Sequence, residues 1–157
     1  MKREAFTLIE LVFVIVVLGI LAAVALPRLG STVESAQIAK AQGDVSAIRA
    51  SIASARQKML VTGQNAYPSK LDNLAGGTSS EGNALFDTNG SLTILTYPIY
   101  SGSATNSGKW RKTAANTYTF TVDTTPVTFT YTAASGIFDC THGTANDEQK
   151  YCKKIAE

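Results

Sequence analysis

The sequence predicts an α+β fold in which a long N-terminal helix, half membrane-spanning and half amphipathic, packs on a small antiparallel β-sheet. Three observations predict it: an apolar run over residues 6–26, an apolar stripe at helical spacing over residues 38–59, and two later runs that alternate apolar residues with threonine. The chain has 157 residues, which is room for one domain and an accessory segment. Its average composition, 45% hydrophobic with a formal charge of +2, describes neither half.

The apolar run predicts a membrane-spanning helix over residues 6–27. Within the run only Thr7 and Glu10 are polar. At about 1.5 Å per residue this helix is about 30 Å long, which matches the hydrocarbon core of a bilayer. Lys2 and Arg3 predict that the N-terminal side stays in the cytoplasm and that the polar C-terminal part crosses the membrane.

Glu10 is unusual in such a span. A carboxylate in the membrane interior costs about 2.5–3.5 kcal/mol on insertion scales, so it requires a partner. Two interpretations are open from the residue alone: the charge reaches water near the headgroups, or it recognises a partner inside the membrane.

The residues around Glu10 form a motif. A short basic leader followed by Ala5-Phe6-Thr7-Leu8-Ile9-Glu10-Leu11 resembles the prepilin signature of type IV pilins and type II secretion pseudopilins. In that family a membrane aspartyl peptidase cuts before the phenylalanine. The resemblance therefore implies a leader over residues 1–5, cleavage between Ala5 and Phe6, and methylation of the new amine of Phe6. Ala5 departs from the glycine that usually precedes the cut.

The same resemblance assigns an assembly role to Glu10, Gly19 and Pro27, which match the acidic residue, the glycine and the proline of the family's helix. Glu10 lies one helical turn from the Phe6 amine, so the two can pair within a chain. Alternatively, the amine of a neighbouring subunit can pair with Glu10 and favour an axial stagger. Pro27 predicts a kink and Gly19 a weak point of about 1 kcal/mol, so the helix is expected to loosen between them.

A rival interpretation is an ordinary secretory signal peptide. Ala23-Val24-Ala25 resembles a signal-peptidase site, and cleavage there would leave a secreted soluble binding protein. The run is long for a signal core, and Glu10 lies where such cores are apolar.

Residues 28–157 are predicted to form the periplasmic or extracellular globular domain, beginning with an amphipathic helix over residues 28–61. Its apolar stripe is expected to cover the protein's own sheet, rather than to form a coiled coil or a filament seam. The stripe consists of Ile38, Ala41, Val45, Ile48, Ile52, Ala55 and Met59. Residues 62–91 are rich in Gly, Ser, Thr and Asn and are expected to form a connecting loop.

An antiparallel sheet is predicted over residues 92–139. Residues 92–97 form the first expected strand, and the period-two runs at 117–122 and 127–132 form two more around the turn at 123–126. The apolar face is expected to meet the helix, while the threonine face meets solvent or a neighbouring subunit. Trp110 is expected to be packed or at the rim.

Cys140 and Cys152 predict a disulfide that closes a loop over residues 140–152 and contributes about 3 kcal/mol. With His142 they could in principle bind zinc, but their spacing matches no recognised zinc pattern. Calcium is a further alternative, with oxygens from Asp139, Asp147 and Glu148, although the spacing is not that of an EF-hand. We expect no metal, no cofactor and no catalysis, because the sequence holds no recognisable catalytic constellation.

One basic–aromatic cluster, Lys109, Trp110, Arg111 and Lys112, is the candidate for contact with DNA or a host surface. Solvation of these side chains is the simpler expectation. The other basic residues are spread along the chain, so nucleic acid is not an expected partner.

The resemblance implies a structural subunit of a type IV pilus-like filament. Its expected partners are copies of itself and related pilins, prepilin peptidase, and an inner-membrane assembly platform with its ATPase. It is expected as a single-pass bacterial inner-membrane protein with a periplasmic C-terminal domain, later incorporated into a filament at the cell surface or in the periplasm. A pseudopilin of type II secretion or DNA uptake is the alternative, and the sequence leaves the sub-role open, including major against minor pilin.

Overall fold

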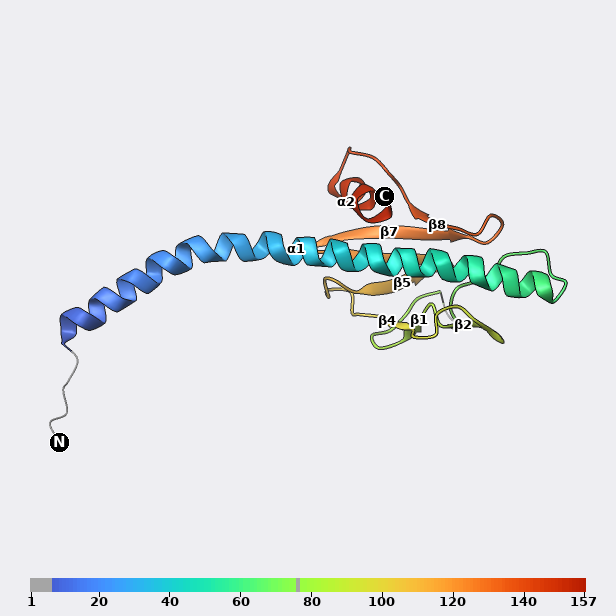
Figure 1. Cartoon of the computed structure of the whole chain (residues 1–157), viewed down its shortest axis with the longest axis horizontal. Helices are drawn as coiled ribbons and strands as arrows, with labels where there is room; N and C mark the ends of the chain where they lie inside the picture. Colours follow the sequence, from blue (N-terminus) through green and yellow to red (C-terminus); the bar gives the residue numbers. More distant parts are fainter. Residues whose placement is uncertain (1–6, 76) are drawn as a thin grey trace, which may run out of the picture. The chain divides into compact units, whose positions relative to one another are not determined.

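The computed structural model describes residues 7–75 and 77–157, with the backbone alone at residues 26–31 (Figure 1). Helix α1, Leu8–Val61, belongs to two compact units, one up to Ser35 and the other Ala36–Glu157. The second compact unit begins at residue 36, and the expected start of the globular domain at residue 28 stays a prediction. The predicted α+β, pilin-like arrangement of a long helix on a small antiparallel sheet is confirmed.

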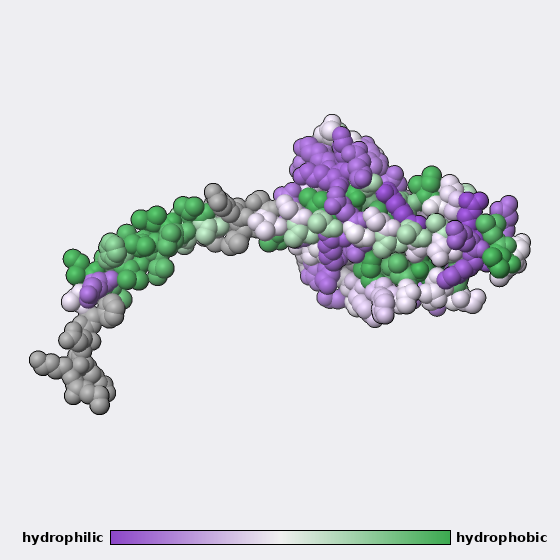
Figure 2. All heavy atoms as spheres, in the orientation of Figure 1, coloured by the Kyte–Doolittle hydropathy of each residue, from purple (hydrophilic) through white to green (hydrophobic). Residues whose placement is uncertain are grey.

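Over Leu8–Ala25, the first unit exposes almost only apolar side chains (Figure 2). Within the described residues, Leu8–Ala25 is the one helical segment long and apolar enough to cross a membrane. The helix backbone is continuous through Gly19 and Pro27. A bend between these two positions stays a prediction.

In the second unit the predicted helical stripe is buried. Ala41, Val45, Ile48, Ile52 and Ala55 are each at most 2% exposed and pack in the hydrophobic core. This confirms that the stripe covers the protein's own sheet. The helix ends in a Schellman motif, in which Gln64 N donates to Met59 O at 2.8 Å and Gly63, with φ of +82°, supplies the left-handed residue.

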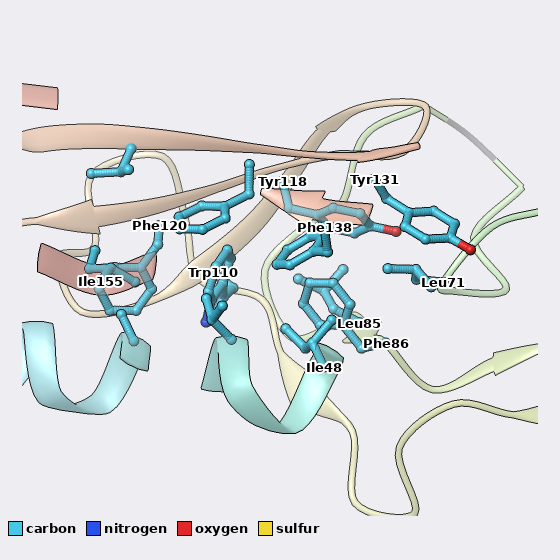
Figure 3. Packing of buried hydrophobic residues seen from close by; sticks show 14 of the residues in the cluster. Ile48, Leu71, Leu85, Phe86, Trp110, Tyr118, Phe120, Tyr131, Phe138 and Ile155 are labelled. Atoms are coloured by element: carbon cyan, nitrogen blue, oxygen red, sulfur yellow. The ribbon is translucent and has the colours of Figure 1, made fainter. Parts of the chain in front are cut away.

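The main sheet is antiparallel, with strand order β5 (Trp110–Ala114), β6 (Thr117–Val122), β7 (Thr125–Thr132) and β8 (Ile137–Cys140). The two alternating runs correspond to β6 and β7, which confirms that prediction. Their apolar side chains pack with the aromatic rings of Phe86, Trp110 and Phe138 between the sheet and α1 (Figure 3). Trp110 is fully buried, so it is a packed residue and not a rim residue.

One strand prediction and one loop prediction are corrected. The expected strand over residues 92–97 is reduced to β3, Leu92–Thr93, which pairs only with β2, Thr88–Asn89. Residues 62–91, expected as a loop, contain β2 and also β1, Ala84–Leu85, which pairs with β4, Ile99–Tyr100. These strands stay short because their pairing strands are short. A strand can extend only as far as its neighbour offers backbone N–H and C=O groups for hydrogen bonds.

The expected disulfide loop over residues 140–152 is also corrected, because helix α2, Asp147–Ala156, occupies its second half. Asn146 is the N-cap, and its side chain accepts from Gln149 N at 2.8 Å. Strand β8 pairs with β7 only at Phe129–Thr132. Helix α2 lies beside the earlier part of β7, where Glu148 Oε1 accepts from Thr128 N at 3.1 Å.

Candidate assembly site

The N-terminal end of α1 carries a reciprocal capping arrangement. Thr7 precedes the helix, and Glu10 N donates to its Oγ1 at 3.4 Å. In return, Glu10 Oε2 accepts from Thr7 N at 2.8 Å and from Thr7 Oγ1 at 2.7 Å. This pattern, Thr-x-x-Glu at the start of a helix, is a capping box. Glu10 therefore has a local partner that the sequence interpretation did not assign to it.

Apolar side chains follow Glu10 around the whole helix. Leu11, Phe13 and Leu18 are between 58% and 68% exposed, and no buried residue occurs in Leu8–Ala25. A Cβ placed on Gly19 would meet no heavy atom within 4 Å, so this chain's own packing does not require a glycine there. The surface of Leu8–Ala25 is therefore suited to an apolar environment that the described residues do not supply.

The predicted cleavage site, Ala5 and Phe6, lies outside the described residues, as does the side chain of Pro27. Their assigned roles stay predictions. Of the predicted assembly residues, only Glu10 and Gly19 have a described local environment.

The disulfide between Cys140 and Cys152 is present, with the Cα atoms 5.9 Å apart. Beside it, His142 Nε2 and Asp139 Oδ1 are 3.0 Å apart, and Arg49 Nη2 donates to the same carboxylate oxygen at 3.0 Å. Arg49 also donates to Phe138 O at 3.1 Å and Ala156 O at 2.9 Å. One side chain of α1 thus connects β8 with the end of α2.

Of the oxygen donors considered for calcium, Asp139 is engaged by His142 and Arg49. Asp147 pairs with Lys150 at 3.0 Å, and Glu148 accepts from the β7 backbone. Each of these three carboxylates thus has a protein partner among the described residues, and calcium binding stays untested.

The basic–aromatic cluster is not a continuous surface, which corrects that hypothesis. Trp110 is buried, and its Nε1 donates to Asp44 Oδ2 on α1 at 2.9 Å. Lys112 is only 3% exposed. Because β5 alternates its side chains between faces, two of the four residues point into the core.

Sequence reasoning missed a buried polar network. Lys112 Nζ lies 2.8 Å from Asp72 Oδ1, and Tyr118 OH donates to Asp72 Oδ2 at 2.5 Å. Lys112 and Tyr118 face each other across β5 and β6, while Asp72 comes from the connecting segment. Burial, together with the adjacent Asp72 carboxylate, raises the pKa of the Tyr118 phenol well above its usual range, so the hydroxyl remains a donor. Strand alternation could have placed Lys112 inward, but only if β5 had been recognised.

Comparison with known proteins bears on the N-terminal unit. The prokaryotic N-terminal methylation motif matches residues 1–26. The chain carries a prepilin-type N-terminus. Its predicted resemblance to the type IV pilin and type II secretion pseudopilin family is thereby confirmed.

Among curated proteins, the type II secretion system core protein G of Pseudomonas aeruginosa is 38% identical over 73 residues. The matched part is 46% of this chain and 48% of that protein, so the chain spans about half the length of the curated relative. No solved structure matches the chain.

Proposed function

We propose that this chain is a structural subunit of a filament of the type IV pilus and type II secretion class. The observation that carries the proposal is the prepilin-type motif, placed at the start of a helix whose Leu8–Ala25 surface is apolar on every side. The subunit enters the inner membrane through this helix, with its second unit in the periplasm. Prepilin peptidase removes residues 1–5, and the N-terminal helices then associate as the filament core.

Glu10 is the residue through which subunits recognise one another. In the inserted subunit, its carboxylate accepts two hydrogen bonds from Thr7, which lowers the cost of a charge in lipid. After cleavage, the cationic amine of Phe6 on a neighbouring subunit offers a stronger, charge-assisted partner. Assembly therefore exchanges a local hydrogen-bonded partner for an intermolecular ion pair.

Within this class we propose a type II secretion pseudopilin as the first sub-role, because the similarity to core protein G extends beyond the motif to 73 residues. A surface pilin is the second candidate, supported by the disulfide, which is frequent in pilins and absent from many pseudopilins. On the threonine face, Thr130 and Thr132 of β7 are exposed and are the candidates for subunit contacts in either role, whereas Thr119 of β6 is buried.

Glu10→Ala tests the assembly role. The variant should insert into the membrane normally and should be lost from filaments, because it has no carboxylate to meet the neighbour's amine. Leu18→Ala is the matched control, since it trims an exposed apolar side chain in the same helix without removing a charge. Membrane fractionation measures insertion, and immunoblotting of sheared or cross-linked filaments measures incorporation. Normal incorporation of Glu10→Ala would contradict the role assigned to Glu10.

N-terminal sequencing of the membrane-extracted protein tests processing. The mature chain should begin at Phe6 and carry a methyl group on its amine. A start at Leu26 would instead support the secretory signal peptide and would remove the helix on which the proposal depends.

Electron microscopy with an antibody to this chain separates the two sub-roles. Long labelled surface fibres at native expression indicate a pilin. Their absence, together with a secretion defect when the chain is deleted, indicates a pseudopilin.

A further inference from the structure

We propose that the corner containing Cys140 and Cys152 binds a zinc ion when its disulfide is reduced. The ligands are the two sulfurs and the ring of His142, with a water molecule in the fourth position. This site is independent of the proposed filament function.

The candidate ligand atoms are already gathered. The donor atoms of Cys140, His142 and Cys152 lie within 4.8 Å of one another. Ligands at about 2.0–2.3 Å from a tetrahedral zinc ion lie about 3.5–3.8 Å from each other. Reduction therefore needs only a local separation of the two sulfurs to admit the ion.

The outer partners of such a site are also present. A histidine that binds zinc commonly donates its other ring N–H to a carboxylate, which fixes the tautomer and the ring orientation. Here His142 Nε2 lies 3.0 Å from Asp139 Oδ1, which leaves Nδ1 for the metal. Asp139 is held in turn by Arg49 Nη2 at 3.0 Å. The His142–Asp139–Arg49 series distinguishes this corner from a disulfide with a histidine nearby by chance.

Reduction does not release the second cysteine, because α2 has other anchors. Arg49 Nη1 donates to Ala156 O at 2.9 Å, and Gln42 Nε2 donates to Lys154 O at 2.8 Å. Glu148 holds the other end of the helix through Thr128 N at 3.1 Å. Ile155 is only 3% exposed. These contacts keep Cys152 opposite Cys140 without a covalent bond.

The proposed reaction is thiol–disulfide exchange coupled to metal binding. A dithiol reductant supplies two electrons and two protons, which opens the disulfide to two thiols. Zinc binding then displaces both thiol protons to solvent, because thiolates are the ligands. A disulfide-carrying oxidant reverses the process: it accepts the two electrons, the Cys140–Cys152 bond forms again, and the ion is released. The zinc form is thus the state of a folded chain that has not yet been oxidised.

The test uses the full chain in detergent, reduced without oxygen by a phosphine, with zinc titrated against a chromophoric chelator. We expect one zinc ion per reduced chain and none in the oxidised chain. Substituting cobalt for zinc should give a thiolate-to-cobalt charge-transfer band together with the visible absorption of tetrahedral cobalt.

Two variants test the ligand His142 and Asp139, the carboxylate that orients it. His142→Ala changes a half-exposed side chain, so the fold should persist, and it should abolish one-to-one binding. Asp139→Asn should weaken binding by about 10–100-fold, as expected when the carboxylate that orients a ligand is removed. Asp147→Asn is the matched control, because its carboxylate pairs with Lys150 and not with the cluster. The proposal is wrong if the reduced chain binds no stoichiometric zinc, or if His142→Ala binds it as tightly as the unchanged chain.

Discussion

Each of the two units contains a carboxylate among apolar side chains. The two carboxylates differ in how far along the sequence their hydrogen-bond partners lie. Glu10 in the first unit is exposed and bonds to Thr7, three residues away. Asp72 in the second unit is fully buried and bonds to Lys112 and Tyr118, which are 40 and 46 residues away. One carboxylate is satisfied by its own helix and the other by the tertiary fold.

This difference separates the tasks of the two units. A carboxylate held only by a local capping box can exchange its partner without disturbing any core, which suits the assembly role proposed for Glu10. Asp72 cannot do so, because removing one partner leaves a charge in a dry interior, and that is strongly destabilising. The carboxylate of the first unit can therefore change its partner, whereas the carboxylate of the second unit is fixed in the core.

The largest expected effect comes from removing the long-range partner of Asp72. Lys112→Met should lower the free energy of unfolding by about 3–5 kcal/mol, because it leaves a buried carboxylate unpaired. Urea unfolding in detergent, followed by the fluorescence of Trp110, the single tryptophan, measures it. Lys109→Met, at an exposed position on the same segment, is the control and should change stability little. An equally small effect of both variants would mean that the Asp72 charge has other compensation.

The next effect comes from the disulfide. Replacing both cysteines by alanine should lower the free energy of unfolding by about 3 kcal/mol, because the closed ring no longer restricts the unfolded chain. Membrane insertion should be unchanged, since the bridge lies wholly in the second unit. Urea unfolding with and without the substitutions checks the first expectation, and membrane fractionation checks the second. A defect in insertion would contradict the independence of the two units.

Alkaline pH tests a second buried group of the globular unit. Burial, and then the neighbouring Tyr67, raise the pKa of Tyr131 from 10.0 to about 12. Its hydroxyl donates to Pro68 O at 2.7 Å. Because the folded state holds this proton more tightly, its stabilising contribution is complete below pH 10 and is lost as the pH rises to 12.

Tyr131→Phe should therefore be less stable than the unchanged chain at pH 8, and the difference should shrink as the pH rises from 10 to 12. Urea midpoints over this range measure it. A difference that stays constant with pH would show that the phenol does not titrate differently in the folded chain.

The smallest expected effect comes from the local partner of Glu10. Thr7→Val removes the capping hydroxyl and should destabilise the start of α1 by about 1 kcal/mol, with no effect on the urea midpoint reported by Trp110. Amide hydrogen exchange at residues 8–11 should increase, and filament incorporation should fall less than in Glu10→Ala. If Thr7→Val abolishes incorporation completely, the hydroxyl is needed for more than capping.

The sequence predicted the elements whose signals are local. The apolar run, the helical stripe and the alternating strands at 117–122 and 127–132 each depend on residues within a few positions of one another. The unpredicted elements depend on distant partners. Strand β5 contains basic residues, so its sequence lacks the apolar alternation that would identify a strand. Lys112 of β5 points into the core, where Asp72 forms an ion pair with it. Helix α2 is short and largely polar, and only its packing beside β7 makes its apolar residues Cys152 and Ile155 core residues.

The sequence by itself therefore determined the membrane-compatible helix, the prepilin-type N-terminus and the pair of cysteines. Each of these features depends only on residue types and on spacings of a few residues. The tertiary structure alone decided that Asp72 joins Lys112 and Tyr118, that Trp110 is buried against α1, and that Arg49 connects β8 with α2. The physical reason is distance along the chain. A buried polar group is acceptable only beside its partner, and the fold brings that partner from dozens of residues away.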